Sequence, residues 1–145
     1  MSNEASNTFK KMLFKGQIPF LTDTFKIILM KEGFTFDEDD DNAYADVVAS
    51  ELANGIGYTT GGATLSGVSV DINESADTVS VTWSNVEWTA TGGTLVADGA
   101  IIYDDSTATT GDDYTDAIVG YITTGATLTA SDGKKIILSS LGITL

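Results

Sequence analysis

Short runs of β-branched and aromatic residues recur along this chain, and residues that favour turns separate them. Side chains such as Val, Ile, Thr, Tyr and Trp suit a pleated sheet, whereas Gly, Asn, Asp and Ser favour tight turns. The pattern predicts a mainly β fold of about six strands. The runs are 24–30, 63–71, 77–88, 99–104, 117–123 and 134–139.

Two of these runs indicate how the strands are buried. Residues 24–30 (TFKIILM) are almost continuously apolar, which is typical of a strand inside a sheet. Val79, Val81 and Trp83 alternate with polar residues, so one face of that strand is expected in a core and the other toward solvent. The predicted architecture is a two-layer β-sandwich or a barrel-like fold.

Two segments have helical rather than strand spacing. Ser6 precedes apolar residues that share one helical face, and Gly16 can end the last turn, so we predict one short helix there. A strand over residues 9–14 is the alternative. Residues 42–52 follow an Asp and Asn cluster and carry Tyr and Val near helical spacing, which predicts a helix or a helical turn.

Length and composition fit one domain. A chain of 145 residues, 42% of them apolar, can bury one hydrophobic core but is too short for two independent cores. We therefore predict a single β-rich domain over residues 1–145. Within it, residues 1–20 are a candidate arm for contacts between subunits.

The charge is strongly negative and unevenly distributed. Seven Lys and no Arg stand against 21 acidic residues, and the formal net charge is −14. Residues 32–133 hold no basic residue and 19 of the 21 acids, so a fold that unites the two chain ends is expected to have one less acidic pole. A phosphate backbone would be repelled, which excludes nucleic acid as an expected partner.

Histidine and cysteine are both absent. Their absence removes disulfides, thiolate nucleophiles, Cys- or His-ligated metals and the most common general base. We predict no enzyme activity, no catalytic residue and no cofactor. No apolar run reaches the length of a signal peptide or a membrane span, so we expect synthesis in a cytosol and no membrane partner.

Two acidic clusters raise the question of a metal site. The run 37–42 starts like an EF-hand loop, but Asn42 replaces the required Gly and Val48 replaces the bidentate Glu. A second cluster brackets a polar loop, and its carboxylates would meet if the loop folds back. An exposed hairpin is the default expectation for this loop. The weak metal candidates in it are Asp104, Asp105, Asp112, Asp113 and Asp116.

Large apolar residues near the chain ends and in the run 77–88 are candidates for contacts with other proteins. Trp83 and Trp88 should face opposite sides of a regular strand, which makes Trp88 the better surface candidate of the two, although core packing is the first expectation for either. The predicted interface residues are Phe9, Phe14, Phe20, Trp88 and Leu145.

Several stretches follow a familiar order: residues 7–30 (NTFKKMLFKGQIPFLTDTFKIILM), 44–64 (YADVVASELANGIGYTTGGAT), 100–105 (AIIYDD) and 117–121 (AIVGY). Together they resemble a family of small structural proteins of tailed bacteriophages. The similarity lies in the residues and the order of the segments and not in a catalytic signature. The extended polar loop at residues 106–116 and the apolar C-terminal end depart from the pattern.

The resemblance implies a virion structural protein, assembled in the cytoplasm of the bacterial host. Within the particle, a capsid decoration (cement) protein fits best, with sister copies in a homotrimer and the major capsid protein as expected partners. A tail, neck or fibre-associated protein is the alternative within the virion. A soluble calcium- or carbohydrate-binding module, using residues 104–116 and Trp88, is the alternative from another class.

Overall fold

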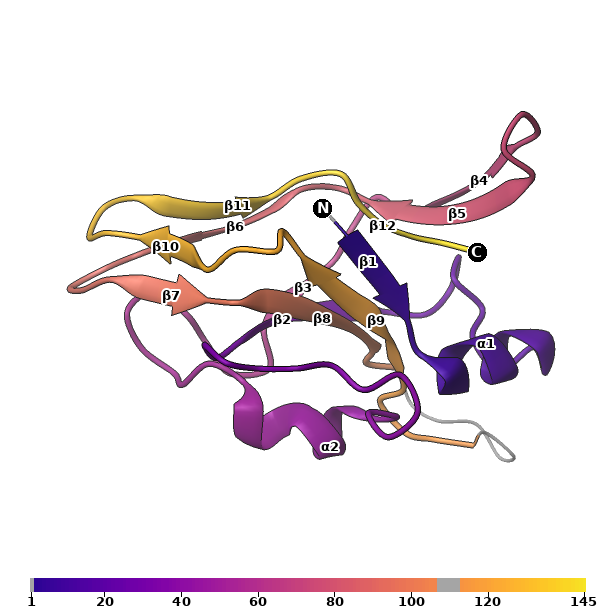
Figure 1. The fold of residues 1–145 in the computed structure, drawn as a ribbon, viewed down its shortest axis with the longest axis horizontal. Helices are drawn as coiled ribbons and strands as arrows, with labels where there is room; N and C mark the ends of the chain where they lie inside the picture. Colours follow the sequence, from indigo (N-terminus) through magenta and orange to yellow (C-terminus); the bar gives the residue numbers. More distant parts are fainter. Residues whose placement is uncertain (1, 107–112) are drawn as a thin grey trace.

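The fold is mainly β, as the sequence predicts, with 42% of the chain in strands and 11% in short helices (Figure 1). It is described by a computed structural model that covers residues 2–106 and 113–145. The elements in chain order are β1 (Ser2–Ala5), α1 (Asn7–Phe14), β2 (Phe25–Met30), α2 (Tyr44–Val47), the 3-10 helix η1 (Val48–Ser50), β3 (Ala63–Thr64), β4 (Ser69–Asn73), β5 (Thr78–Trp83), β6 (Val86–Thr89), β7 (Leu95–Ala97), β8 (Gly99–Asp104), β9 (Ile118–Thr123), β10 (Leu128–Ala130), β11 (Lys135–Leu138) and β12 (Leu141–Thr144).

One antiparallel sheet forms the centre of the molecule, with the strand order β1-β9-β8-β2-β3. Every residue of β8 is buried, and so is every residue of β9 except Thr123. Successive side chains of a strand point to opposite faces, so this burial means that both faces of the central sheet are covered.

The smaller sheets cover the first face. They have the orders β12-β5-β4, β11-β6 and β10-β7, and Figure 1 shows β11, β6, β12 and β5 lying along one side of β8 and β9. Ile27 and Ile102 of the central sheet share one hydrophobic core with Trp83, Trp88 and Leu141 of the smaller sheets. This packing of sheets gives the β-sandwich-like fold that the sequence predicts.

The segment between β2 and β3 covers the second face. Ile28 and Ile101 point to this side and pack with Val47 of α2, next to the partly buried Phe34 and Phe36. The Phe36 ring stacks on Tyr121 of β9 with ring centroids 5.6 Å apart. The predicted helical segment 42–52 is therefore short, with α2 and η1 forming a lid on the sheet.

Helix α1 confirms the predicted short helix, and a bulge in β9 holds its start. Ile102 pairs with Gly120 while Tyr103 pairs with Ile118, which leaves Val119 as an extra residue in β9. Ser6 uses the displaced carbonyls: its N–H donates to Val119 O (3.1 Å) and its Oγ to Ile118 O (3.0 Å). The same Oγ caps the helix by accepting from the backbone N–H of Phe9.

Residues 2–20 lie within the fold, which differs from the expected arm. Strand β1 pairs with β9 along its full length, and Phe9, Met12 and Ile18 are buried in the main core. Capping by Ser6 and this burial keep the segment on the body of the molecule, and Phe14 at the end of α1 is exposed.

The predicted runs correspond to strands, with two of them divided. The run 63–71 contains β3 and the start of β4, and the run 77–88 contains β5 and most of β6 because the chain leaves the strand conformation at Ser84 and Asn85. Strands β1, β7, β10 and β12 were not predicted. Each has only three or four residues and forms through pairing with a distant strand.

Candidate functional site

An apolar surface lies where the β4–β5 hairpin extends past the core. Val70 of β4 pairs with Val81, and Ile72 pairs with Val79, so these four side chains share one face of the hairpin. Val81 is buried, whereas the other three are exposed, and Ile72 is 73% exposed. The hairpin projects at the same end of the molecule as α1 and the C-terminus, and its turn points away from both (Figure 1).

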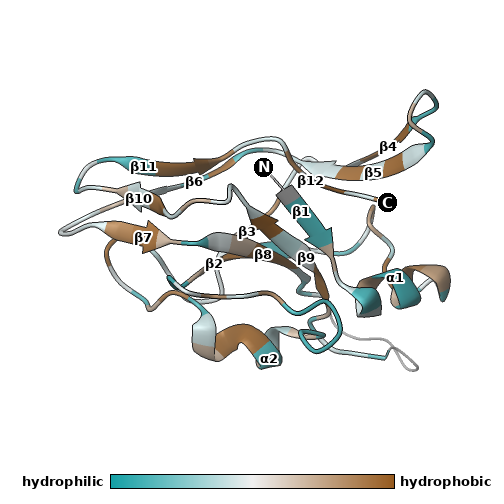
Figure 2. Cartoon of the chain, viewed as in Figure 1, coloured by the Kyte–Doolittle hydropathy of each residue, from teal (hydrophilic) through white to brown (hydrophobic). Residues whose placement is uncertain are grey.

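A groove runs between this hairpin, α1 and the C-terminal residues. All its lining side chains are apolar: Phe9, Leu13, Phe20, Val70, Val79, Val81, Ile143 and Leu145. Beside these elements, Phe14 at the end of α1 is 94% exposed and Leu21 is 76% exposed. Figure 2 shows the hydrophobic colour on the hairpin strands and on the last turn of α1.

The predicted interface residues fall in different environments. Phe14 and Leu145 are exposed, and Phe20 is half-buried, with its ring stacked 5.2 Å from that of Phe25. Phe9 is 1% exposed and Trp88 is 7% exposed, so neither offers a surface to a partner in this structure.

The position of Trp88 has a simple cause. The break at Ser84 and Asn85 ends β5 and begins β6, which resets the alternation of side chains. Trp83 and Trp88 consequently face the same core, contrary to the expectation of opposite faces.

The second acidic cluster is held by lysines. Asp113 accepts from Lys15 (2.6 Å) and Lys11 (2.9 Å), and these contacts hold its pKa below the ordinary value. Asp105 pairs with Lys26 at 3.0 Å. Burial, and then the charges of Asp105 and Asp104, raise the pKa of Asp116.

The remaining predicted metal candidates are Asp104 and Asp112. Asp104 is buried and accepts from the backbone N–H of Ser106, while Asp112 lies outside the described residues. Within residues 2–106 and 113–145, no three carboxylates form a group that could hold a metal ion.

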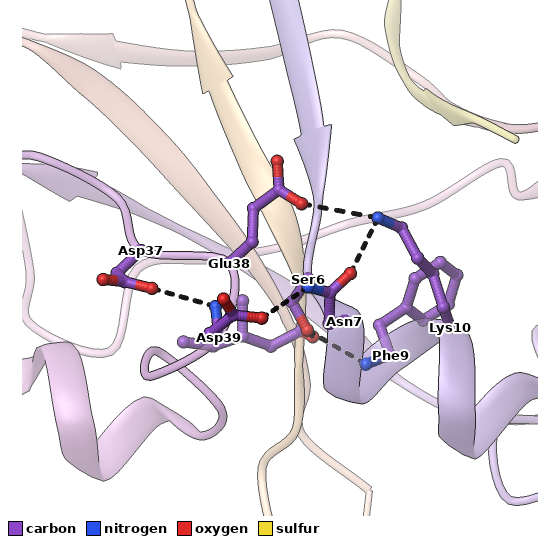
Figure 3. A network of polar contacts seen from close by, with 8 residues as sticks. Ser6, Asn7, Phe9, Lys10, Asp37, Glu38 and Asp39 are labelled. Carbon is purple, nitrogen blue, oxygen red and sulfur yellow. Dashed lines mark hydrogen bonds and ion pairs between the residues drawn. The ribbon is translucent and has the colours of Figure 1, made fainter.

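The first acidic cluster joins its own loop to α1 (Figure 3). Asp37 Oδ1 accepts from the backbone N–H groups of Asp39 and Asp40, which closes a local turn. Asn7 Nδ2 donates to Asp39 Oδ1 at 2.6 Å, and Lys10 lies 3.5 Å from Glu38. The carboxylates therefore position a loop, as a solvated acidic turn does.

The expected less acidic pole does not form as predicted. The chain ends do meet, because β1 and β12 are neighbours, and α1 with its three lysines lies at this end. Lys134 and Lys135 lie at the start of β11, toward the opposite end of the molecule (Figure 1). Pairing of β11 with β6 carries these two lysines away from the termini.

A buried carboxylate that sequence reasoning missed fixes the lid on the central sheet. Glu51 is 3% exposed, and it accepts from Tyr58 Oη (2.6 Å), from the backbone N–H of Gly61 (2.7 Å) and from Tyr44 Oη. Tyr58 Oη also accepts from the N–H of Leu29 in β2. The Glu51 side chain thus joins three parts of the segment 44–61, and Tyr58 links them to the sheet.

The tyrosines of this network have raised pKa values. Burial and then the hydrogen bond to Glu51 raise the pKa of Tyr44 to about 12. The same causes raise the pKa of Tyr58 further. Burial also raises the pKa of Tyr103, whose ring stacks on Tyr44 at 4.9 Å.

No family model, curated protein or solved structure was found to match this chain. In the described part of the chain, the helices are too short or too polar to cross a bilayer.

Replacing Glu51 with Gln should destabilise the protein by about 1–3 kcal/mol, because an amide offers one acceptor oxygen to donors that a carboxylate satisfies with two. Urea unfolding monitored by tryptophan fluorescence measures the change. Glu74→Gln is the matched control, because Glu74 is exposed in the β4–β5 turn and should leave the midpoint unchanged. Equal stability of both variants would contradict the role of Glu51.

Alkaline pH should lower the free energy of unfolding through ionisation of Tyr44. Because its pKa is raised on folding, the folded state keeps a proton that the unfolded state loses, so stability falls as pH rises from about 10 to 12. Tyr44→Phe removes this contribution, and the stability difference between wild type and variant should shrink over that range. Exposed Tyr114 supplies the control, Tyr114→Phe. A constant difference for Tyr44→Phe from pH 8 to 12 would exclude the effect.

Proposed function

We propose that this protein is a structural component of a tailed-bacteriophage particle, and that it decorates the capsid shell. The observation that carries the proposal is the apolar groove and its exposed neighbours Phe14, Leu21 and Ile72. Contiguous exposed apolar surface on a soluble domain is typical of a site where another protein packs. The resemblance to phage structural proteins supports the virion as the place of that contact.

The segments that carry the resemblance build the framework of the fold. Residues 44–64 contain Tyr44, Glu51 and Tyr58 of the buried network, and residues 100–105 and 117–121 form most of β8 and β9. The similarity therefore supports a shared architecture. The β4–β5 hairpin lies outside these segments, where an attachment surface specific to this chain can vary.

A decoration role fits the distribution of charge. The apolar groove can pack on the major capsid protein or on sister copies in a homotrimer, while the acidic surface faces solvent. Burying the apolar side chains in such contacts links neighbouring subunits and makes the shell harder to open. Assembly would take place in the bacterial cytoplasm, and the mature location is the virion.

Two observations weigh against a calcium- or carbohydrate-binding module. Lys11 and Lys15 occupy both carboxylate oxygens of Asp113, where a cation would bind. The Trp88 ring, proposed to stack on a sugar, lies in the core. A tail, neck or fibre position remains the rival within the virion, and the location of the protein in fractionated particles separates it from decoration.

Purified capsids should carry the protein in a fixed ratio to the major capsid protein, and capsids that lack it should open at lower temperature. Ile72→Asp, on the exposed hairpin face, should lower the copy number, because it places a charge in the apolar contact. Ile137→Asp on β11 is the matched control, since Ile137 is exposed outside the groove. Quantitative gel analysis and thermal release of DNA measure both effects. Recovery of the protein only with isolated tails would contradict decoration.

A further inference from the structure

The apolar face of the sheet β12-β5-β4 is only partly covered by its own chain. Leu141, Ile143 and Val81 on this face are buried against the core. Farther along the same face, toward the turn of the hairpin, Val79 and Ile72 are exposed. The face is thus continuous with the hydrophobic core and ends in solvent.

The free edge of β4 is less suited to pairing with a second β4. Asp71 lies in the middle of this edge strand, and every residue of β4 is exposed. Two antiparallel β4 strands would bring like charges together, and charged residues on an edge oppose strand addition. The face of the hairpin, and not its edge, is the surface available for a partner.

Helix α1 has the complementary character. Phe14 projects from its last turn, and Leu21 is exposed shortly after it. Residues 7–15 contain three lysines and no acid, whereas residues 69–80 contain three acids and no lysine. One element therefore combines exposed apolar side chains with positive charge, and the other combines them with negative charge.

This complementarity identifies a second copy as the occupant. Two molecules of net charge −14 repel over most of their surfaces. The exception is the contact of a hairpin with α1, where the exposed Lys11 and Lys15 share the single carboxylate of Asp113 and can meet the acids of residues 69–80. Opposite charges around an apolar centre set orientation and favour encounter.

We propose that this protein self-associates by packing the β4–β5 hairpin of one copy on α1 of a second copy. Each copy carries both surfaces. A twofold dimer or a closed ring therefore covers the hairpin and the helix of every subunit. The inference rests on the proposed function for the expectation of a homo-oligomer, and it assigns the surface that forms it.

Sedimentation velocity over a concentration series tests this contact in solution. Wild-type protein should form a species whose mass is a multiple of 15.2 kDa. Phe14→Asp and Ile72→Asp should each lower the association constant about tenfold or more, because each buries a charge in the contact. Ile137→Asp, outside the groove, should associate like wild type. Unchanged thermal unfolding of the dilute variants confirms that they are folded.

Mixing the two weakened variants gives the sharper result. The intact hairpin of Phe14→Asp can pack on the intact α1 of Ile72→Asp, so the mixture should associate more strongly than either variant alone. A hairpin-to-hairpin contact would give no such gain. A mixture no better than its components, a monomeric wild type at all concentrations, or association unaffected by both variants would overturn the inference.

The solution experiment is independent of the particle. A monomeric wild type that still decorates capsids would overturn the self-association contact and leave the decoration role in place. Association in solution without capsid binding would overturn decoration and leave this contact in place.

Discussion

Both faces of the central sheet must be covered, and this requirement sets the positions of the other elements. Strands β8 and β9 are apolar on both sides, so leaving either face in water would expose residues such as Ile101 or Ile102. Antiparallel sheets often leave one face exposed to solvent, whereas β8 and β9 are covered on both faces. The smaller sheets and α1 cover one side, and the long segment between β2 and β3 covers the other.

The segment between β2 and β3 has little regular structure, and a network of hydrogen bonds holds it in place. Its regular structure amounts to α2 and η1, which are too short to be stable alone. Glu51 compensates by accepting hydrogen bonds from Tyr44, Tyr58 and Gly61, and Tyr58 links the network to β2. A buried carboxylate is tolerated because its oxygens are satisfied, and the loss of that satisfaction would loosen the lid.

Much of this fold follows from local sequence, but its long-range contacts do not. The runs of β2, β8 and β9 and the cap of α1 are local signals, and they predicted these elements well. Strands such as β1 (SNEA) carry no β-branched residue and form only through a distant partner. Burial of Glu51 depends on where Tyr44 and Tyr58 lie in space, and the shared core of Trp83 and Trp88 depends on a two-residue break.

The face of the β4–β5 hairpin is only partly covered by the residues that the structure describes. Hydrogen–deuterium exchange of the intact protein at low and high concentration tests most directly whether a second copy covers the rest of it. Amides of β8 and β9 should exchange slowly at both concentrations, whereas those of residues 69–80 and 7–15 should gain protection as concentration rises. Exchange of both segments that is independent of concentration would contradict the account.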